Sequence, residues 1–318
     1  MPCYSPLEGF RSRQTTDSGK RKLVFNAVDG FRDLPVTVPC GHCLGCRLER
    51  ARQWAVRLMH EKSCHELSTF VTLTYDDEHL PESGSLVMAH FQTFLKDLRN
   101  FHEKDARKLI RDGHKNVKVP TLRFFHCGEY GETNRRPHYH AILFGIDFAD
   151  KTKHSKNRQG DQIYKSETLN KIWGRGHCWI GSVTQKSCAY VARYIMKKVT
   201  GEAAPAHYRN VNLETGEIYD LHPEYVTMSR RPGIGAAWFE KFRKDVFPSD
   251  TVIANGKEQL PPKYYLRKLA ETSPKSEAKI KAKRVRRAKK HSADSTPERL
   301  RARLICKQSQ ISQLKRNL

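Results

Sequence analysis

The chain has 318 residues, and its 58 Lys and Arg against 34 Asp and Glu give a formal net charge of +24 at pH 7. This excess argues against an enzyme of neutral metabolites and indicates a nucleic-acid partner, because each neutralised phosphate releases counterions and raises affinity. No apolar run approaches the ~20 residues of a membrane span. The nine cysteines, odd in number and unevenly clustered, argue against a secreted disulfide framework. We therefore expect a protein of the reducing cytoplasm with no membrane association.

The N-terminal part of the chain shows little periodicity. Residues 1–39 are mostly polar and predict irregular structure around the apolar piece 23–25. A cysteine knuckle follows at 38–46, and helical spacing of apolar residues predicts a helix over 47–61.

The middle of the chain alternates strand and helix patterns. In chain order, we predict a strand over 69–75, an amphipathic helix over 88–104 with Phe91, Phe94, Leu95, Leu98 and Phe101 on one stripe, strands over 121–126 and 139–144, a polar loop over 151–160, a helix over 167–173, a strand over 179–183, and helices over 185–199 and 236–246. This order implies a sandwiched α+β domain over roughly residues 60–200. From about Ser273 the composition shifts, and residues 279–290 form a basic block.

A histidine pair forms the first candidate site. His138 and His140 are one residue apart on a predicted strand, so they point to the same face. A hairpin with the preceding strand would bring Glu129 over both imidazoles. Two imidazoles and a carboxylate leave positions open for phosphate oxygen and water, which suits Mg²⁺ or Mn²⁺. Glu132 is the rival third ligand, and two histidines that merely line a strand are the ordinary alternative.

A tyrosine pair forms the second candidate site. Tyr190 and Tyr194 lie one helical turn apart on the predicted helix. Tyrosines on helices are usually packing residues. Here the predicted apolar stripe consists of Cys188, Val191, Ala192, Ile195 and Val199. That stripe leaves the tyrosines beside Lys186 and Lys197, which favours a role facing phosphate. A phenol becomes an effective nucleophile only when a metal and cations stabilise the developing charge.

The cysteine knuckle forms a third candidate site. Cys40, Cys43 and Cys46 make two overlapping C-x-x-C spacings, which are typical of zinc ligands. Cys3, His42 or Cys64 could complete a tetrahedral site. Reduced cysteines around a tight glycine turn are the alternative.

Three segments together resemble a known family. Residues 70–75, 138–140 and 190–197 occur in the order of the three motifs of the HUH rolling-circle replication initiators. Residues 38–47 and 228–235 further resemble the initiators of gokushovirus-like small single-stranded DNA phages (Microviridae). The resemblance implies an HUH endonuclease core over 61–250, with a central antiparallel sheet and flanking helices (RRM-like or ferredoxin-like). It is preceded by a segment 1–60 with the knuckle and followed by a basic, partly disordered or helical extension over 251–318.

The resemblance also implies an activity. His138 and His140 match the metal-binding pair, and Tyr190 and Tyr194 match the two nucleophiles. Such a protein nicks the viral origin on the double-stranded replicative form, forms a 5′-phosphotyrosine link, leaves a 3′-OH primer and rejoins the ends into circular single-stranded DNA. Its partners would be origin DNA and the host helicase, single-strand-binding protein and polymerase, in the host bacterial cytoplasm.

Basic residues near these motifs are the expected DNA contacts. They are Arg135, Arg136, Arg193, Lys197, Lys198, Arg230 and Arg231. Two other functions remain open at this point: a non-catalytic basic nucleic-acid-binding protein with a zinc knuckle, and a relaxase or transposase of the same chemistry.

Overall fold

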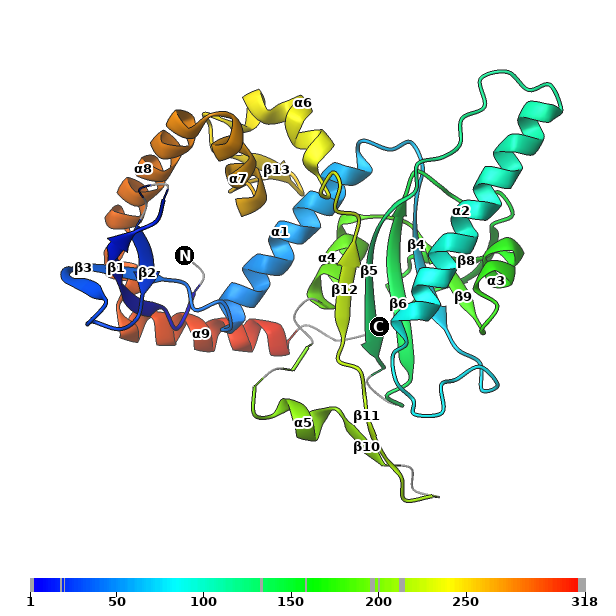
Figure 1. Ribbon diagram of the computed structural model, residues 1–318, viewed down its shortest axis with the longest axis horizontal. Helices are drawn as coiled ribbons and strands as arrows, with labels where there is room; N and C mark the ends of the chain where they lie inside the picture. Colours follow the sequence, from blue (N-terminus) through cyan, green and yellow to red (C-terminus); the bar gives the residue numbers. More distant parts are fainter. Residues whose placement is uncertain are drawn as a thin grey trace. The chain divides into compact units, whose positions relative to one another are not determined.

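The computed structural model describes residues 3–17, 19, 21–131, 134–157, 159–194, 198–199, 201–211 and 215–313. The chain forms two compact units (Figure 1), one made of Met1–Arg50 with Leu269–Arg316 and the other of Ala51–Lys268. The sequence predicted three consecutive segments, 1–60, 61–250 and 251–318. In the structure, the N-terminal and C-terminal segments instead belong to one unit. In the described part of the chain, no helix is both long and apolar enough to cross a membrane.

The larger unit is built on a seven-stranded sheet in which every neighbouring pair is antiparallel. In spatial order its strands are β12 (Tyr225–Met228), β5 (Arg123–Tyr130), β6 (Pro137–Phe144), β4 (Ser68–Thr74), β9 (Cys178–Gly181), β8 (Gln162–Lys165) and β7 (Thr152–Lys156). The four predicted strands are confirmed, with shifted ends, as the adjacent strands β5, β6, β4 and β9. The predicted α+β class with a central antiparallel sheet is therefore confirmed.

The hairpin of β7 and β8 replaces the polar loop predicted over 151–160, so that prediction is wrong. All five residues of β7 are exposed. An exposed edge strand needs no alternation of apolar residues, and the sequence therefore carried no strand pattern there.

Helices cover both faces of the large sheet (Figure 1). One layer contains α2 (Met88–Arg111) and α3 (Glu167–Trp173), and the other contains the second half of α1 (Leu44–Lys62) and α4 (Gln185–Arg193). The strand residues Val71, Leu73, Tyr139, Ala141 and Leu143 pack with the first layer, and Phe125, Cys127, Ile142 and Phe144 pack with the second. Because side chains alternate along a strand, the two histidines of β6 face the layer of α1 and α4.

The predicted helices are largely confirmed. α3 and α6 (Ala236–Val246) have the predicted bounds, while α2 runs further than expected and its Phe101 is 40% exposed, so that residue does not belong to the buried stripe. α4 ends at Arg193, and residues 195–197 of the predicted longer helix lie outside the described residues. The other elements of this unit are α5 (Ala204–His207), α7 (Lys263–Thr272, which continues into the other unit), and the ribbons β10 (Arg209–Val211) with β11 (Ile218–Asp220) and β13 (Val252–Ala254) with β14 (Lys257–Gln259).

The smaller unit joins the two ends of the chain. Its N-terminal part is a three-stranded antiparallel sheet in the order β2 (Arg21–Val24), β1 (Leu7–Thr15) and β3 (Gly30–Val38). The irregular structure predicted for 1–39 is therefore wrong. Its C-terminal part contains α8 (Pro274–Lys290), a short 3₁₀ helix (Ser292–Ser295) and α9 (Pro297–Ser312). The basic extension is thus helical through most of its described length.

A buried histidine should make the stability of the larger unit sensitive to acid. His60 is 8% exposed, stacks on Trp238 with ring centroids 3.5 Å apart, and its Nδ1 lies 2.8 Å from the hydroxyl of Tyr265. Burial lowers the pKa of His60 from 6.5 to about 4. The unfolded chain therefore binds a proton more readily between pH 6.5 and 4, and stability present above pH 6.5 is lost as the pH falls.

We expect the suppressed protonation of His60 to lower the free energy of unfolding by about 3 kcal/mol as the pH falls from 6.5 to 4, because each pKa unit corresponds to about 1.4 kcal/mol. Urea unfolding at pH 7.5 and pH 4.5 measures the loss. His60→Asn keeps an acceptor close to the position of Nδ1 and should show a smaller loss than the parent protein. An equal loss in both proteins would mean that other groups govern the acid sensitivity.

Candidate active site

The histidine pair lies on β6, at the centre of the large sheet. In the β5–β6 hairpin Glu129 is opposite His138 and Cys127 is opposite His140. Residues directly opposite in an antiparallel pair share a face. The predicted hairpin is therefore confirmed, and it places Glu129 on the same face as both imidazoles.

His140 is held by two polar contacts inside the protein. Its Nε2 lies 2.7 Å from Oε1 of Glu129, and its Nδ1 lies 3.0 Å from Oγ1 of Thr72. A carboxylate only accepts, so here Nε2 carries the proton and the Thr72 hydroxyl donates to Nδ1. His140 is 6% exposed and Glu129 is 5% exposed. Thr72 was not predicted, although its place on β4 opposite His140 follows from the alternation of that strand.

His138 has a defined orientation as well. Its Nδ1 lies 2.5 Å from the carbonyl oxygen of Arg136. Because a carbonyl only accepts, Nδ1 carries the proton and Nε2 keeps its lone pair. Burial lowers the pKa of His138, which favours the neutral imidazole that a metal requires. Tyr139, between the two histidines, points to the other layer, where it is fully buried.

Tyr190 of α4 and Tyr194, the C-cap residue of that helix, both contact His140. The Tyr190 hydroxyl lies 3.5 Å from Nε2 of His140. The Tyr194 ring stacks on the His140 ring with centroids 5.3 Å apart and an interplanar angle of 11°. The two tyrosine rings are themselves 4.8 Å apart and nearly perpendicular.

The expected separation of these tyrosines from the apolar stripe is wrong. Tyr194 is 4% exposed and belongs to the core of this layer, and half-buried Tyr190 packs against it. Tyr194 follows Val191 by three residues, a spacing that continues the same stripe. Lys186, by contrast, is exposed, and Lys197 lies outside the described residues.

Both phenols are hard to ionise in this setting. Burial, and next the carboxylate of Glu129, raise the pKa of Tyr190 and of Tyr194 above the ordinary value. At neutral pH each is therefore a neutral phenol, and nucleophilic attack by either oxygen would need added positive charge nearby.

The side chains of His138, His140 and Glu129 offer the donor set of a divalent cation, two imidazole nitrogens and one carboxylate oxygen. The Thr72 hydroxyl can also accept, so the His140 tautomer with a free Nε2 keeps that contact. In this structure the three donor atoms do not all lie within 4.8 Å of one another. Among the described residues, only the four-cysteine group of the smaller unit is that close. The set fits a divalent cation by its chemistry, and the rival ligand Glu132 lies outside the described residues.

The predicted DNA-contacting residues near the histidines differ in their availability. Arg136 is paired with Asp77 at 2.8 Å, and Arg135 donates to the carbonyl of His207 at 2.8 Å. Arg193 is exposed, with its guanidinium 5.8 Å from the centre of the Tyr190 ring, and Lys198 is exposed. Arg193 is thus the described cation that lies beside the tyrosine pair.

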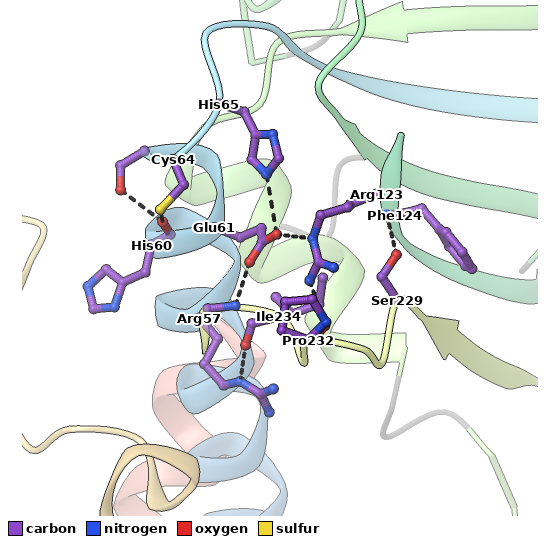
Figure 2. Close-up of polar contacts among 12 residues, drawn as sticks. Arg57, His60, Glu61, Cys64, His65, Arg123, Phe124, Ser229, Pro232 and Ile234 are labelled. Atoms are coloured by element: carbon purple, nitrogen blue, oxygen red, sulfur yellow. Dashed lines mark hydrogen bonds and ion pairs between the residues drawn. The ribbon is translucent and has the colours of Figure 1, made fainter. Parts of the chain in front are cut away.

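Arg230 and Arg231 are exposed on the loop between β12 and α6, and a buried carboxylate anchors that loop. Glu61 of α1 is 2% exposed, binds Nε of Arg123 at 2.5 Å, and accepts from the backbone N–H of Gly235 at 2.6 Å (Figure 2). Arg123 in turn donates to the carbonyl of Pro232 at 2.8 Å. Before the arginine pair, the backbone N–H of Phe124 donates to the hydroxyl of Ser229, so the loop is held on both sides of Arg230 and Arg231.

The loop arginines should therefore act as fixed phosphate contacts. Replacing both Arg230 and Arg231 with Ala should weaken DNA binding by a similar factor for all sequences, roughly tenfold, because phosphate contacts carry no base information. The negative slope of log K, the DNA association constant, against log salt concentration should become less steep by about 1.5. Fluorescence anisotropy over a salt series measures both. Arg107→Ala with Arg111→Ala, on the exposed end of α2, is the matched control; an equal effect there would mean that only total charge matters.

The three predicted zinc ligands converge in the smaller unit. The Sγ atoms of Cys40, Cys43 and Cys46 lie with that of Cys3 so that all four are within 4.8 Å of one another. Of the three fourth ligands that the sequence allowed, the structure thus selects Cys3. Cys64 belongs to the larger unit and contacts the carbonyl of His60 instead.

Known proteins resemble this chain along most of its length. Residues 68–199 match the family described as replication-associated protein ORF2/G2P. The chain is 35% identical over 268 residues to replication-associated protein VP4 of Bdellovibrio phage phiMH2K, covering 83% of this chain and 76% of that protein. It is 32% identical to replication-associated protein ORF2 of Spiroplasma virus 4 over 73% of this chain and 68% of that protein. Replication-associated protein ORF4 of Chlamydia phage 1 is 29% identical over 54% of this chain and 41% of that protein.

These matches identify the family. No solved structure matches the chain significantly. The chain belongs to the replication-associated proteins of small single-stranded DNA phages, as its three motifs predicted.

Proposed function

We propose that this protein is the origin-specific endonuclease and strand transferase of rolling-circle replication. One tyrosine of α4 attacks a phosphodiester of the viral origin and remains joined to the DNA. The free 3′-OH then primes synthesis, and the stored phosphotyrosine bond later rejoins the strand into a circle.

One arrangement carries the proposal: both candidate nucleophiles contact the same imidazole. Tyr190 approaches Nε2 of His140 through its hydroxyl, and Tyr194 stacks on the ring of His140. Tyrosines that serve only for packing would not require contact with a histidine that is hydrogen-bonded to a buried carboxylate. Membership of a replication-associated family and the charge of +24 support DNA as the substrate.

The transfer balances without any further reactant. The tyrosine oxygen bonds to phosphorus as its proton leaves, and the bond from phosphorus to the 3′-oxygen breaks. The departing 3′-oxygen takes up a proton and becomes the 3′-OH, while the phosphate stays on tyrosine as a 5′-phosphotyrosine diester. Rejoining is the reverse, with a 3′-OH as the attacking group, so no ATP is required.

His138, His140 and Glu129 would hold the divalent cation. A bound Mg²⁺ or Mn²⁺ supplies Lewis-acid polarisation of the phosphate and stabilises negative charge. The residues of the chain perform the other tasks: Thr72 and the carbonyl of Arg136 orient the two imidazoles. Arg193 adds positive charge beside Tyr190.

Two tyrosines within one turn suit a reaction with two cuts. One holds the 5′ end of the displaced strand while the other cuts the regenerated origin. The released 3′-OH then closes the circle by attacking the first phosphotyrosine. Tyr190 is the better first nucleophile, because it is half-buried while Tyr194 is 4% exposed.

Incubation with supercoiled origin DNA and Mn²⁺ tests this function. We expect nicked circles that carry protease-sensitive protein at the 5′ end, and closed single-stranded circles after replication. Tight binding without any nick would instead support the non-catalytic DNA-binding protein. Nicking and rejoining without a replication origin would support a relaxase or a transposase.

A further inference from the structure

The four cysteines of the smaller unit have the spacing of a metal-bound set. The Sγ of Cys3 lies 3.7 Å from that of Cys40 and 3.9 Å from that of Cys43. Four sulfurs at 2.3 Å from one ion in a tetrahedron are about 3.8 Å apart. A disulfide would bring two sulfurs to about 2.05 Å, and none of the four cysteines forms one.

Backbone groups surround these sulfurs in the manner expected for thiolates. The N–H groups of Cys40 and Cys43 donate to the sulfurs of Cys3 and Cys40, each at 3.3 Å, and the N–H of Tyr4 donates to the sulfur of Cys43 at 3.3 Å. Gly41, with a φ of +83°, supplies the left-handed turn that folds Cys40 back toward Cys43. Donors aimed at sulfur stabilise its negative charge and fix its position.

The β1–β3 sheet itself buries few apolar side chains. Among the described apolar side chains before Ala51, only that of Cys3 is buried. Leu7, Phe25, Val28 and Leu34 are all more than 40% exposed. In the C-terminal helices of the same unit, Ile280 and Leu300 are buried, so the unit has only a small apolar core, and a cross-link or a metal adds the stability that such a core lacks.

We propose that Cys3, Cys40, Cys43 and Cys46 bind one structural Zn²⁺ as a tetrathiolate site. Thiolate donors select zinc over Mg²⁺ or Mn²⁺, and a closed set of four protein ligands leaves no position for substrate. The site ties the segment before β1 to the first turn of α1, and so it links the two ends of the chain segment that forms the β1–β3 sheet. It is independent of the histidine site and of the nicking reaction.

Metal analysis of the full-length protein, purified with its thiols reduced, tests the site. We expect one zinc per chain. Cys3→Ser and Cys46→Ser should each lower zinc affinity by more than about 100-fold, since even changes outside the ligand set cost 10–100-fold. Cys64→Ser, in the larger unit, and Cys306→Ser, whose exposed sulfur is outside the four-sulfur group, are the matched controls and should retain the metal.

Two measurements on the unmutated chain keep the test independent of folding defects. Cobalt substitution should give the visible bands of tetrahedral Co²⁺ and strong sulfur-to-cobalt charge transfer. Removal of the metal with a chelator should make residues 3–43 sensitive to protease, while the larger unit stays resistant. Reduced protein that takes up neither zinc nor cobalt would overturn the proposal, as would iron in place of zinc or equal metal loss in the control variants.

Discussion

Replacing both Tyr190 and Tyr194 with Phe should abolish the covalent protein–DNA adduct and reduce nicking by at least about 10³-fold. Only two hydroxyl oxygens are lost, and both are the proposed nucleophiles. The rings remain, so their packing against His140 should persist. Denaturing gels of labelled origin DNA after incubation with Mn²⁺ measure the adduct and the nick together.

The single variants should differ from one another. Tyr190→Phe should slow nicking more than Tyr194→Phe, because Tyr190 is the less buried residue and its hydroxyl lies 3.5 Å from Nε2 of His140. Each single variant should still nick through the neighbouring phenol, whereas circle closure, which needs both, should fail in both. Tyr164→Phe on β8 is the matched control. A fully active double variant would show that α4 is only a packing element.

Replacing His138 or His140 with Ala should abolish cleavage and leave duplex binding nearly unchanged. Loss of an imidazole ligand removes the cation, whose Lewis-acid contribution of several kcal/mol corresponds to about 10³-fold or more in rate. Binding depends on the basic surface, which these variants keep. Nicking rates and anisotropy on the same origin DNA separate the two effects.

Controls for the histidine variants follow from the structure. His140→Ala leaves the buried Glu129 carboxylate without its imidazole partner, so thermal unfolding must show that the variant is folded at the assay temperature. His154→Ala, on the exposed strand β7, should have no effect. Glu129→Ala should resemble the histidine variants; if only Glu132→Ala does so, the third ligand is Glu132. Nicking by the double histidine variant would contradict the assignment of a catalytic metal to His138 and His140.

The central strands and the hairpin of the site could be predicted from the sequence, because they follow local rules. Strand β4 alternates and is rich in β-forming residues, β6 contains a short apolar run, and the short β5–β6 connection favours antiparallel pairing. That pairing alone places Glu129 opposite His138. α3 was equally predictable, since Ser166 caps its start and Gly174 ends it in the left-handed conformation.

The features that the sequence did not predict correctly also have specific physical causes. The strands β1, β2, β3 and β7 bury few or no apolar side chains, so they lack the alternation on which strand prediction depends. The orientation of Tyr190 and Tyr194 is set by the histidine face of the sheet, a contact made 50 residues away. Cys3 could not be selected over His42 and Cys64 because its distance of 37 residues from Cys40 carries no spacing signal.

Peptide mapping of the covalent adduct tests the central claim most directly. The protein is incubated with labelled single-stranded origin DNA and Mn²⁺, the DNA is trimmed with nuclease, and the nucleotide-bearing peptide is sequenced by mass spectrometry. We expect a nucleotide joined through phosphate to Tyr190 or Tyr194. An adduct on any residue outside α4 and its C-cap, or efficient nicking without an adduct, would contradict this claim.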